Sequence, residues 1–197
     1  MGSPSPRSTI AATGPPPSGP WCAADTDTKT AGSPVTEAVT PPFRLLNAPG
    51  EYEIGGVLLN GVNTTAKRKD RDAGGAPRNV AFVVEIDDLR VCHLGDLDHT
   101  PGQDLIEELS DIDILLTPVG GHGALDAAAA AEVISLLQPR IVVPIRYQTD
   151  AAAMPLDPID PFIKQLGREA PQPQARLSVT RSNLPEETQL VMLDYRK

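Results

Sequence analysis

The stretch that decides the fold is LRVCHLGDLDH, residues 89–99. It begins as a run of strand-forming apolar residues and ends, around Gly95, in a polar cluster. Two histidines and two aspartates fall within the seven residues from His93 to His99. Side chains placed directly after a buried strand lie at the edge of a sheet, where α/β proteins build their sites. The stretch therefore predicts a strand that ends in one wall of a metal site.

Downstream of this stretch, the sequence predicts alternating strands and helices. IDILLTPVGG (112–121) and RIVVPIRY (140–147) have the continuous apolar pattern of buried strands, and LDAAAAAEVISLLQP (125–139) that of a helix. A strand–helix–strand unit implies parallel pairing through a crossover. Thr100 is the expected cap of another helix, in TPGQDLIEELSD (100–111).

The remaining segments complete a mixed sheet. NVAFVVEI (79–86) and residues 89–94 flank Asp87-Asp88 and predict a β-hairpin, with both strands covered on both faces. Further predicted elements are strands in EYEIGGVLLNGVNT (51–64), a helix in DPIDPFIKQLG (157–167), and closing strands in RLSVT (176–180) and TQLVMLDY (188–195). The expected class is α/β, with helices on the outside of the sheet.

Composition narrows the classes of function. The chain has 197 residues and a formal net charge of −9, which disfavours nucleic-acid binding by bulk charge. Cys22 and Cys92 stand in different contexts and suggest no disulfide framework. No apolar run has the length of a membrane span. These features predict a soluble, cytoplasmic protein with no nucleic-acid or membrane partner.

Residues 1–42 differ from the rest of the chain. They hold 9 of the 21 prolines and show no hydrophobic period, so we predict a disordered segment followed by a domain over residues 43–197. An alternative function lies in TGPPPSGPW (13–21), which could form a polyproline II helix and bind an aromatic groove of a partner.

Four residues are candidate metal ligands. Asp96 follows Gly95 at a strand end, His93 and His99 lie three residues to either side of it, and His122 follows a glycine pair after the next buried strand. Histidine nitrogen and carboxylate oxygen are ligands that zinc prefers. The alternative is structural, because an Asp after a strand often caps a turn and a lone His often makes a surface hydrogen bond.

Several segments together resemble the metallo-β-lactamase superfamily: NAPGEYEIGGVLLNGV, DLRVCHLGDLDH, DIDILLTPVGG, AAEVISLLQPRIVVPIRY and LPEETQLVMLD. The chain is similar to the small prokaryotic zinc-dependent hydrolase-like proteins related to the ascorbate-6-phosphate lactonases, over about residues 43–197. The resemblance implies an αββα sandwich of mixed sheets, incomplete here at its N-terminus. It also implies a small-molecule substrate and a zinc or manganese cofactor, whose bound water would be the nucleophile.

When the family's site is matched residue by residue to this sequence, most of its metal ligands are missing. Asp96 matches the bridging aspartate of the family, and Gly120 and Gly121 match the glycine loop beside its pocket. The His-x-His-x-Asp-His motif is absent, as is a histidine near Thr65, and Arg146 replaces the last ligand histidine. We expect Arg146 to pair with Asp96.

Two functions follow from this depletion. The first is a metal-dependent hydrolase-like protein that is impaired because most metal ligands are absent. The alternative is a non-catalytic, metal-free member of the fold that acts as a structural or small-anion-binding module.

The strands that such a sandwich needs ahead of residue 43 have no recognisable counterpart. Residues 1–42 are then either a disordered extension or the product of a shifted reading frame. Read from the third base, the codons of DTDTKT (25–30) give His/Tyr-x-His/Tyr-x-Asp/Asn, the first part of the family's metal motif. The nucleotide sequence distinguishes the two, since only the second requires an intact upstream frame that encodes the missing strands.

Overall fold

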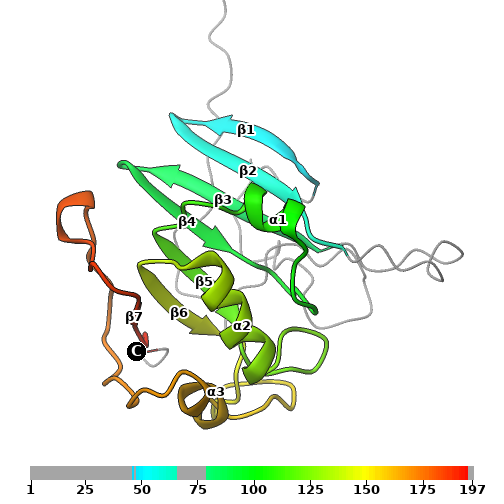
Figure 1. The fold of residues 1–197 in the computed structure, drawn as a ribbon, viewed down its shortest axis with the longest axis vertical. Helices are drawn as coiled ribbons and strands as arrows, with labels where there is room; N and C mark the ends of the chain where they lie inside the picture. The colour runs from blue at the N-terminus through cyan, green and yellow to red at the C-terminus, as the bar shows by residue number, and fades with distance from the viewer. Residues whose placement is uncertain (1–45, 47, 66–78, 195–197) are drawn as a thin grey trace, which may run out of the picture.

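A single mixed sheet organises the part of the chain that the computed structural model describes, which is residues 46, 48–65 and 79–194. Its seven strands follow one another in space in the order of the sequence (Figure 1). They are β1 (Gly50–Ile54), β2 (Val57–Asn63), β3 (Val80–Ile86), β4 (Leu89–His93), β5 (Ile114–Pro118), β6 (Ile141–Ile145) and β7 (Gln189–Leu190). The helices are α1 (Gln103–Glu108), α2 (Ala127–Leu137) and α3 (Asp160–Gln165), with a 3-10 turn at Arg181–Asn183. The predicted α/β class is confirmed.

The first four strands are antiparallel, and tight turns join them in pairs. Ile86 of β3 is the register partner of Leu89 of β4, so the connecting turn has two residues. Asp87 and Asp88 in that turn have φ values of 50° and 61°. Two positive φ values suit the twist of a two-residue hairpin, and Asp tolerates them better than most residues. The predicted hairpin is confirmed.

From β4 to β7 the strands are parallel. Helix α2 makes the crossover from β5 to β6, as the sequence predicts. Asp126 caps it by accepting a hydrogen bond from the Ala129 N–H at 2.9 Å. The helix ends at Leu137, its C-cap residue Gln138 has the left-handed conformation with φ 47°, and Pro139 follows.

Helix α1 begins differently from the prediction. Gly102 stands at its N-cap without a side-chain hydrogen bond. The helix starts too late for Thr100 to reach its free N–H groups. The Thr100 hydroxyl instead donates to Glu132 Oε2 of α2 at 2.8 Å. The predicted cap is wrong, and Thr100 instead joins the segment before α1 to helix α2.

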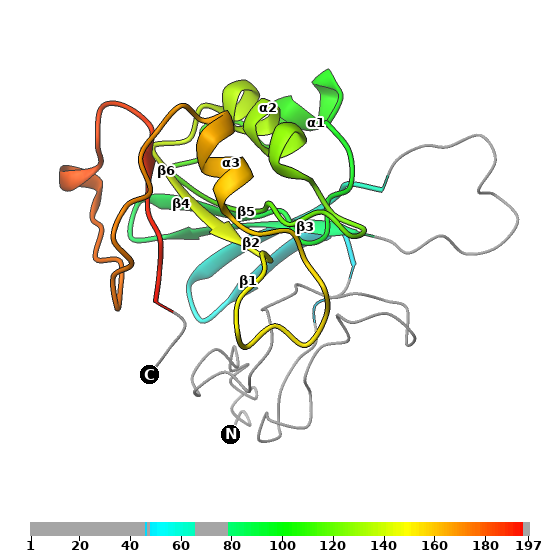
Figure 2. The same cartoon turned by 90° about the horizontal axis from the view of Figure 1, so that it is seen from below.

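All three helices lie on one face of the sheet, as Figure 2 shows. The main core lies between them and the strands. Its fully buried side chains include Leu94, Leu97, Leu109, Leu115, Leu125, Val133 and Phe162. This helix layer and sheet make up two layers of the expected αββα sandwich, and a second sheet is not among the described residues.

The opposite face of β5 and β6 is covered by the C-terminal segment. Ile114, Ile141 and Val143 pack there with Leu177 and Val179. Both faces of β5 and β6 are therefore covered, which agrees with the buried strands predicted there. The strand predicted over residues 176–180 is wrong, because its alternating apolar side chains pack against the sheet without joining its ladder.

Some predictions concern residues outside the described part of the chain. These are the disordered segment 1–42, with the frame-shift hypothesis and the Pro-rich stretch. Among the described residues, no helix has the length and apolarity needed to cross a membrane.

Candidate functional site

The loops that follow β4, β5 and β6 meet at one edge of the sheet, because the carboxyl ends of parallel strands point the same way. Backbone hydrogen bonds join these loops. The Val119 N–H donates to the Ile145 carbonyl at 3.2 Å, and the Leu125 N–H donates to the Leu97 carbonyl at 2.7 Å. The three loops carry the predicted site residues Asp96, Gly120, Gly121, His122 and Arg146.

The Arg146 side chain connects the three loops. Its Nε lies 3.1 Å from Asp96 Oδ1, with the two side chains 6% and 23% exposed. Nη1 donates to the Gly121 carbonyl at 2.5 Å, and Nη2 donates to the His122 carbonyl at 2.9 Å. Nε has no hydrogen-bond partner among the described residues. Its contact with Asp96 is therefore an ion pair that lacks hydrogen-bond geometry. The pairing of Arg146 with Asp96 that the sequence predicts is present.

The two glycines lie directly against this arrangement. A Cβ on Gly120 would overlap the Arg146 carbonyl oxygen and lie 2.9 Å from Tyr147 Cα. A Cβ on Gly121, where φ is +61°, would lie 2.9 Å from Asp157 Oδ2. The glycines thus allow the loop after β5 to approach the loop after β6 closely.

His93 and His99 are each engaged locally. The Gly95 N–H donates to His93 Nδ1 at 2.9 Å, so that nitrogen carries a lone pair and no proton. His99 Nδ1 lies 2.8 Å from Asp98 Oδ1, the carboxylate of its neighbour in sequence. Each of these two rings thus contacts a residue within two positions of it in sequence.

His122 lies at the edge of the site. Its Nε2 is 3.5 Å from Asp157 Oδ1, and both side chains are about half exposed. Its backbone has a φ of 53°, and its carbonyl is the one that accepts from Arg146. The backbone of His122, rather than its imidazole, therefore joins the central cluster.

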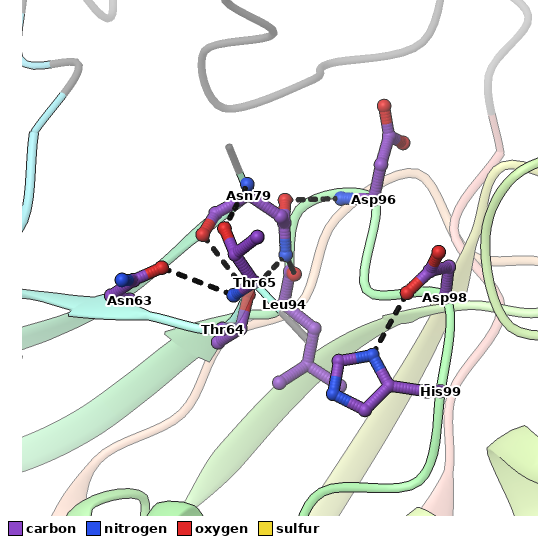
Figure 3. A network of polar contacts seen from close by, with 8 residues as sticks. All are labelled: Asn63, Thr64, Thr65, Asn79, Leu94, Asp96, Asp98 and His99. Carbon is purple, nitrogen blue, oxygen red and sulfur yellow. Dashed lines mark hydrogen bonds and ion pairs between the residues drawn. The ribbon is translucent and has the colours of Figure 1, made fainter. Parts of the chain in front are cut away.

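Asn79 is a residue of the site that the sequence interpretation missed. Its Nδ2 donates to Thr64 Oγ1 at 2.5 Å and to the Leu94 carbonyl at 2.8 Å, and its Oδ1 accepts from the Asp96 N–H at 2.8 Å (Figure 3). A Cβ on Gly95 would overlap this Oδ1. Asn79 thus fixes the backbone of the turn that presents Asp96. A lone polar residue at the head of the apolar run 79–86 was the available signal.

The place where the resemblance expects a histidine is taken by short hydroxyl side chains. Thr65 Oγ1 accepts from the Asn79 N–H at 3.2 Å, and the Thr65 N–H donates to Asn63 Oδ1 at 3.1 Å. Figure 3 shows these groups gathered around Asn79, with the Asp96 carboxylate directed away from them. The Thr65 hydroxyl supports the Asn79 backbone.

A cavity of about 270 Å³ lies at a different place, between α2, α3 and β7. Its lining includes Ile134, Leu166, Arg168 and Leu190. The residues assigned to a pocket from the sequence, Gly120, Gly121 and Arg146, are not part of that lining.

Comparison with known proteins identifies the family. A family model described as a β-lactamase superfamily domain matches residues 23–146. A solved structure from Thermotoga maritima, of a candidate Zn-dependent hydrolase of the metallo-β-lactamase superfamily, is 32% identical with a TM-score of 0.64. The match covers 77% of this chain and 72% of that one. The chain belongs to the metallo-β-lactamase superfamily.

Curated relatives in this superfamily are named as metal-dependent hydrolases. The chain is 35% identical over 102 residues to one of the UPF0173 family from Pyrococcus horikoshii. A relative from Thermococcus onnurineus is 34% identical over 102 residues. Each match covers 51% of this chain, and it spans 44% and 45% of the two relatives, which is less than half of their length. Over about half of its length, this chain is therefore similar to proteins that are named metal-dependent hydrolases.

The described residues do not fit the metal that membership of the superfamily implies. Among residues 46, 48–65 and 79–194, no group of three or more His, Cys, Asp or Glu side chains is placed to hold a metal ion. Asp96 instead faces the guanidinium of Arg146, a fixed positive charge. The ligand roles assigned to Asp96, His93, His99 and His122 therefore stay predictions.

The Cys92 thiol lies on β4 beneath the site and is fully buried. Burial raises its pKa from 9.0 to about 12, although the nearby Arg90 charge acts in the opposite direction. Since the thiolate is the reactive form, Cys92 is an inert core residue at neutral pH.

This raised pKa predicts a loss of stability in alkali. Below pH 9.0 the thiol is protonated in both states; above it the unfolded chain releases the proton while the folded chain keeps it up to about pH 12. In that window the free energy of unfolding should fall by up to about 1.4 kcal/mol per pH unit from this group. Urea titrations between pH 8 and 11 measure the slope in the parent and in Cys92→Ala. Equal slopes in the two proteins would rule out this contribution.

Proposed function

We propose that this protein is a metallo-β-lactamase-fold relative of the metal-dependent hydrolases whose own metal chemistry is impaired. The observation that carries the proposal is the ion pair of the buried Arg146 side chain with the partly buried Asp96 carboxylate, 3.1 Å apart. Arginine stays protonated at all ordinary pH values, so this position always carries a positive charge.

Electrostatics supports the proposal. A divalent cation bound at Asp96 would lie within a few ångström of the Arg146 guanidinium, and like charges in a poorly solvated place repel by several kcal/mol. The guanidinium has no easy way to withdraw, because two backbone carbonyls hold its Nη1 and Nη2. We therefore expect zinc or manganese to be absent or weakly held.

Between the two non-catalytic roles, a structural one is better supported than small-anion binding. An anion-binding arginine presents its paired N–H groups to the ligand. Arg146 is buried, and its Nη1 and Nη2 already donate to the carbonyls of Gly121 and His122. Its charge already faces a carboxylate, Asp96, which would repel a second anion.

Metal content tests the proposal. Elemental analysis of the purified, chelator-washed full chain, folded by circular dichroism and then equilibrated with zinc or manganese, should give far less than one ion per chain. The same measurement on Asp96→Ala and on the matched control Asp98→Ala should give no difference between the three proteins.

The contrary result is equally clear. Near-stoichiometric zinc or manganese that is lost in Asp96→Ala and kept in Asp98→Ala would mean that Asp96 ligates a metal. Hydrolysis of ester, lactone and phosphate substrates would then be measured with the metal-loaded protein. The proposal that its metal chemistry is impaired would be abandoned.

The proposal also includes the cellular compartment of the protein and the kind of molecule that it binds. An acidic chain with two cysteines in unrelated contexts suits a reducing cytoplasm and disfavours nucleic acid as a partner. If activity remains, a small molecule is the expected substrate.

A further inference from the structure

Three oxygen atoms from two loops converge on one side chain. Asp96 Oδ1 comes from the loop after β4, and the carbonyl oxygens of Gly121 and His122 come from the loop after β5. All three contact the guanidinium of Arg146, which follows β6. The loop after each of the three parallel strands thus contributes to one partly buried cluster at their common edge.

Such a cluster of oxygens needs a cation. A carboxylate and two carbonyls that face one another with little solvent would repel and stay poorly solvated without a positive charge between them. In metal sites a bound ion provides that charge and links the segments that carry its ligands. Here the planar guanidinium meets the same requirement, with separate nitrogens for the three oxygens.

We propose that Arg146 is a built-in cation that takes the place of a metal ion as the link between the loops after β4, β5 and β6. The inference rests on the proposed function, since it assumes that no metal holds these loops. It adds that the loops are organised by this side chain and that the fold needs no metal to close this edge.

The surrounding contacts are arranged to keep the oxygens in place. The Asp96 N–H donates to Asn79 Oδ1 at 2.8 Å, and the Gly121 N–H donates to the Leu125 carbonyl at 3.0 Å. The backbone of Arg146 itself has φ 53°, a conformation that non-glycine residues seldom adopt. A strained backbone at the residue that makes the link indicates that its position is imposed by the site.

Chemical rescue tests the inference. Arg146→Ala removes the cation and leaves a gap bounded by the Asp96 carboxylate and two carbonyls. Its thermal midpoint should fall by about 10 °C, because a buried charge loses its partner. Millimolar guanidinium, far below the molar range that denatures proteins, should restore part of that loss. Equal concentrations of sodium or ammonium should restore less.

Two further variants make the test specific. In Asp96→Asn/Arg146→Ala the gap has lost its negative charge, so guanidinium should no longer raise the midpoint. Arg146→Lys keeps the positive charge but loses the planar guanidinium with its separate nitrogens. Its thermal midpoint should therefore lie between those of the parent and Arg146→Ala. If the alanine variant does not fold, the thermal midpoint of Arg146→Lys is compared with that of the parent instead.

Failure of this inference is distinguishable from failure of the proposed function. Parent-like midpoints for Arg146→Ala and Arg146→Lys, or equal rescue by guanidinium and ammonium, would overturn the role of Arg146 as the link, even in a metal-free protein. A parent midpoint that rises with zinc or falls with chelator would also overturn it. Stoichiometric metal in the parent without such an effect on the midpoint would refute the proposed function alone.

Discussion

Gly120→Ala is expected to destabilise the protein by about 3 kcal/mol, at the upper end of overpacking costs. The new methyl group would overlap the Arg146 carbonyl oxygen and lie 2.9 Å from Tyr147 Cα. Both of these atoms belong to the backbone, so no side-chain rotation can relieve the contact. The loops after β5 and β6 would have to separate, which strains the hydrogen bond from the Val119 N–H to the Ile145 carbonyl. Urea unfolding followed by circular dichroism measures the change.

Gly102→Ala is the matched control for this prediction. No atom lies within 4 Å of a Cβ built on Gly102, and its φ of −73° suits any residue. We expect its free energy of unfolding to stay within about 0.5 kcal/mol of the parent value. Similar unfolding midpoints for the two alanine variants would show that the Gly120 contact is not tight in solution.

The sequence predicted best the elements that depend on neighbours along the chain. The hairpin at Asp87-Asp88 and helix α2 follow from turn chemistry, apolar spacing and a cap at Asp126, all of which act within a few residues. The parallel order of β5 and β6 followed because a helix of this length between two strands leaves few other topologies.

The wrong predictions concern residues whose local sequence pattern does not determine which other residues they contact. The alternation in residues 176–180 indicates half-buried side chains, and it is met by packing of Leu177 and Val179 on the sheet face. Thr100 has the chemistry of a cap, but the helix begins after Gly102 and the hydroxyl contacts Glu132. In both cases the type of interaction agrees with the residue's chemistry. Its partner depends on the tertiary structure and cannot be inferred from neighbouring residues.

The site shows the same division. That Asp96 would meet Arg146 was predictable from the resemblance, which places both residues at positions of the family's metal ligands. The ring directions of His93 and His99 were not, because the Gly95 N–H and the Asp98 carboxylate fix them locally. Spacing along the chain does not determine how these rings turn, so their roles as metal ligands stay predictions.

Asn79→Ala is expected to cost about 3 kcal/mol, because three hydrogen bonds at roughly 1 kcal/mol each are lost at once. The amide joins the Thr64 hydroxyl, the Leu94 carbonyl and the Asp96 N–H, which belong to segments distant in sequence. Without it the Asp96 turn loses its anchor to β3. Urea unfolding gives the free energy, and amide hydrogen exchange at Asp96 should become faster than in the parent.

Two variants show whether the amide itself is responsible. Asn63→Ala removes an exposed side chain that accepts a hydrogen bond from the Thr65 N–H, and should cost less than about 1 kcal/mol. Asn79→Asp keeps an acceptor for the Asp96 N–H but sets a carboxylate against the Leu94 carbonyl, 2.8 Å from the present nitrogen. We expect it to be as unstable as Asn79→Ala. A parent-like Asn79→Asp would mean that the donor half of the amide is dispensable, and that acceptance from Asp96 alone positions the turn.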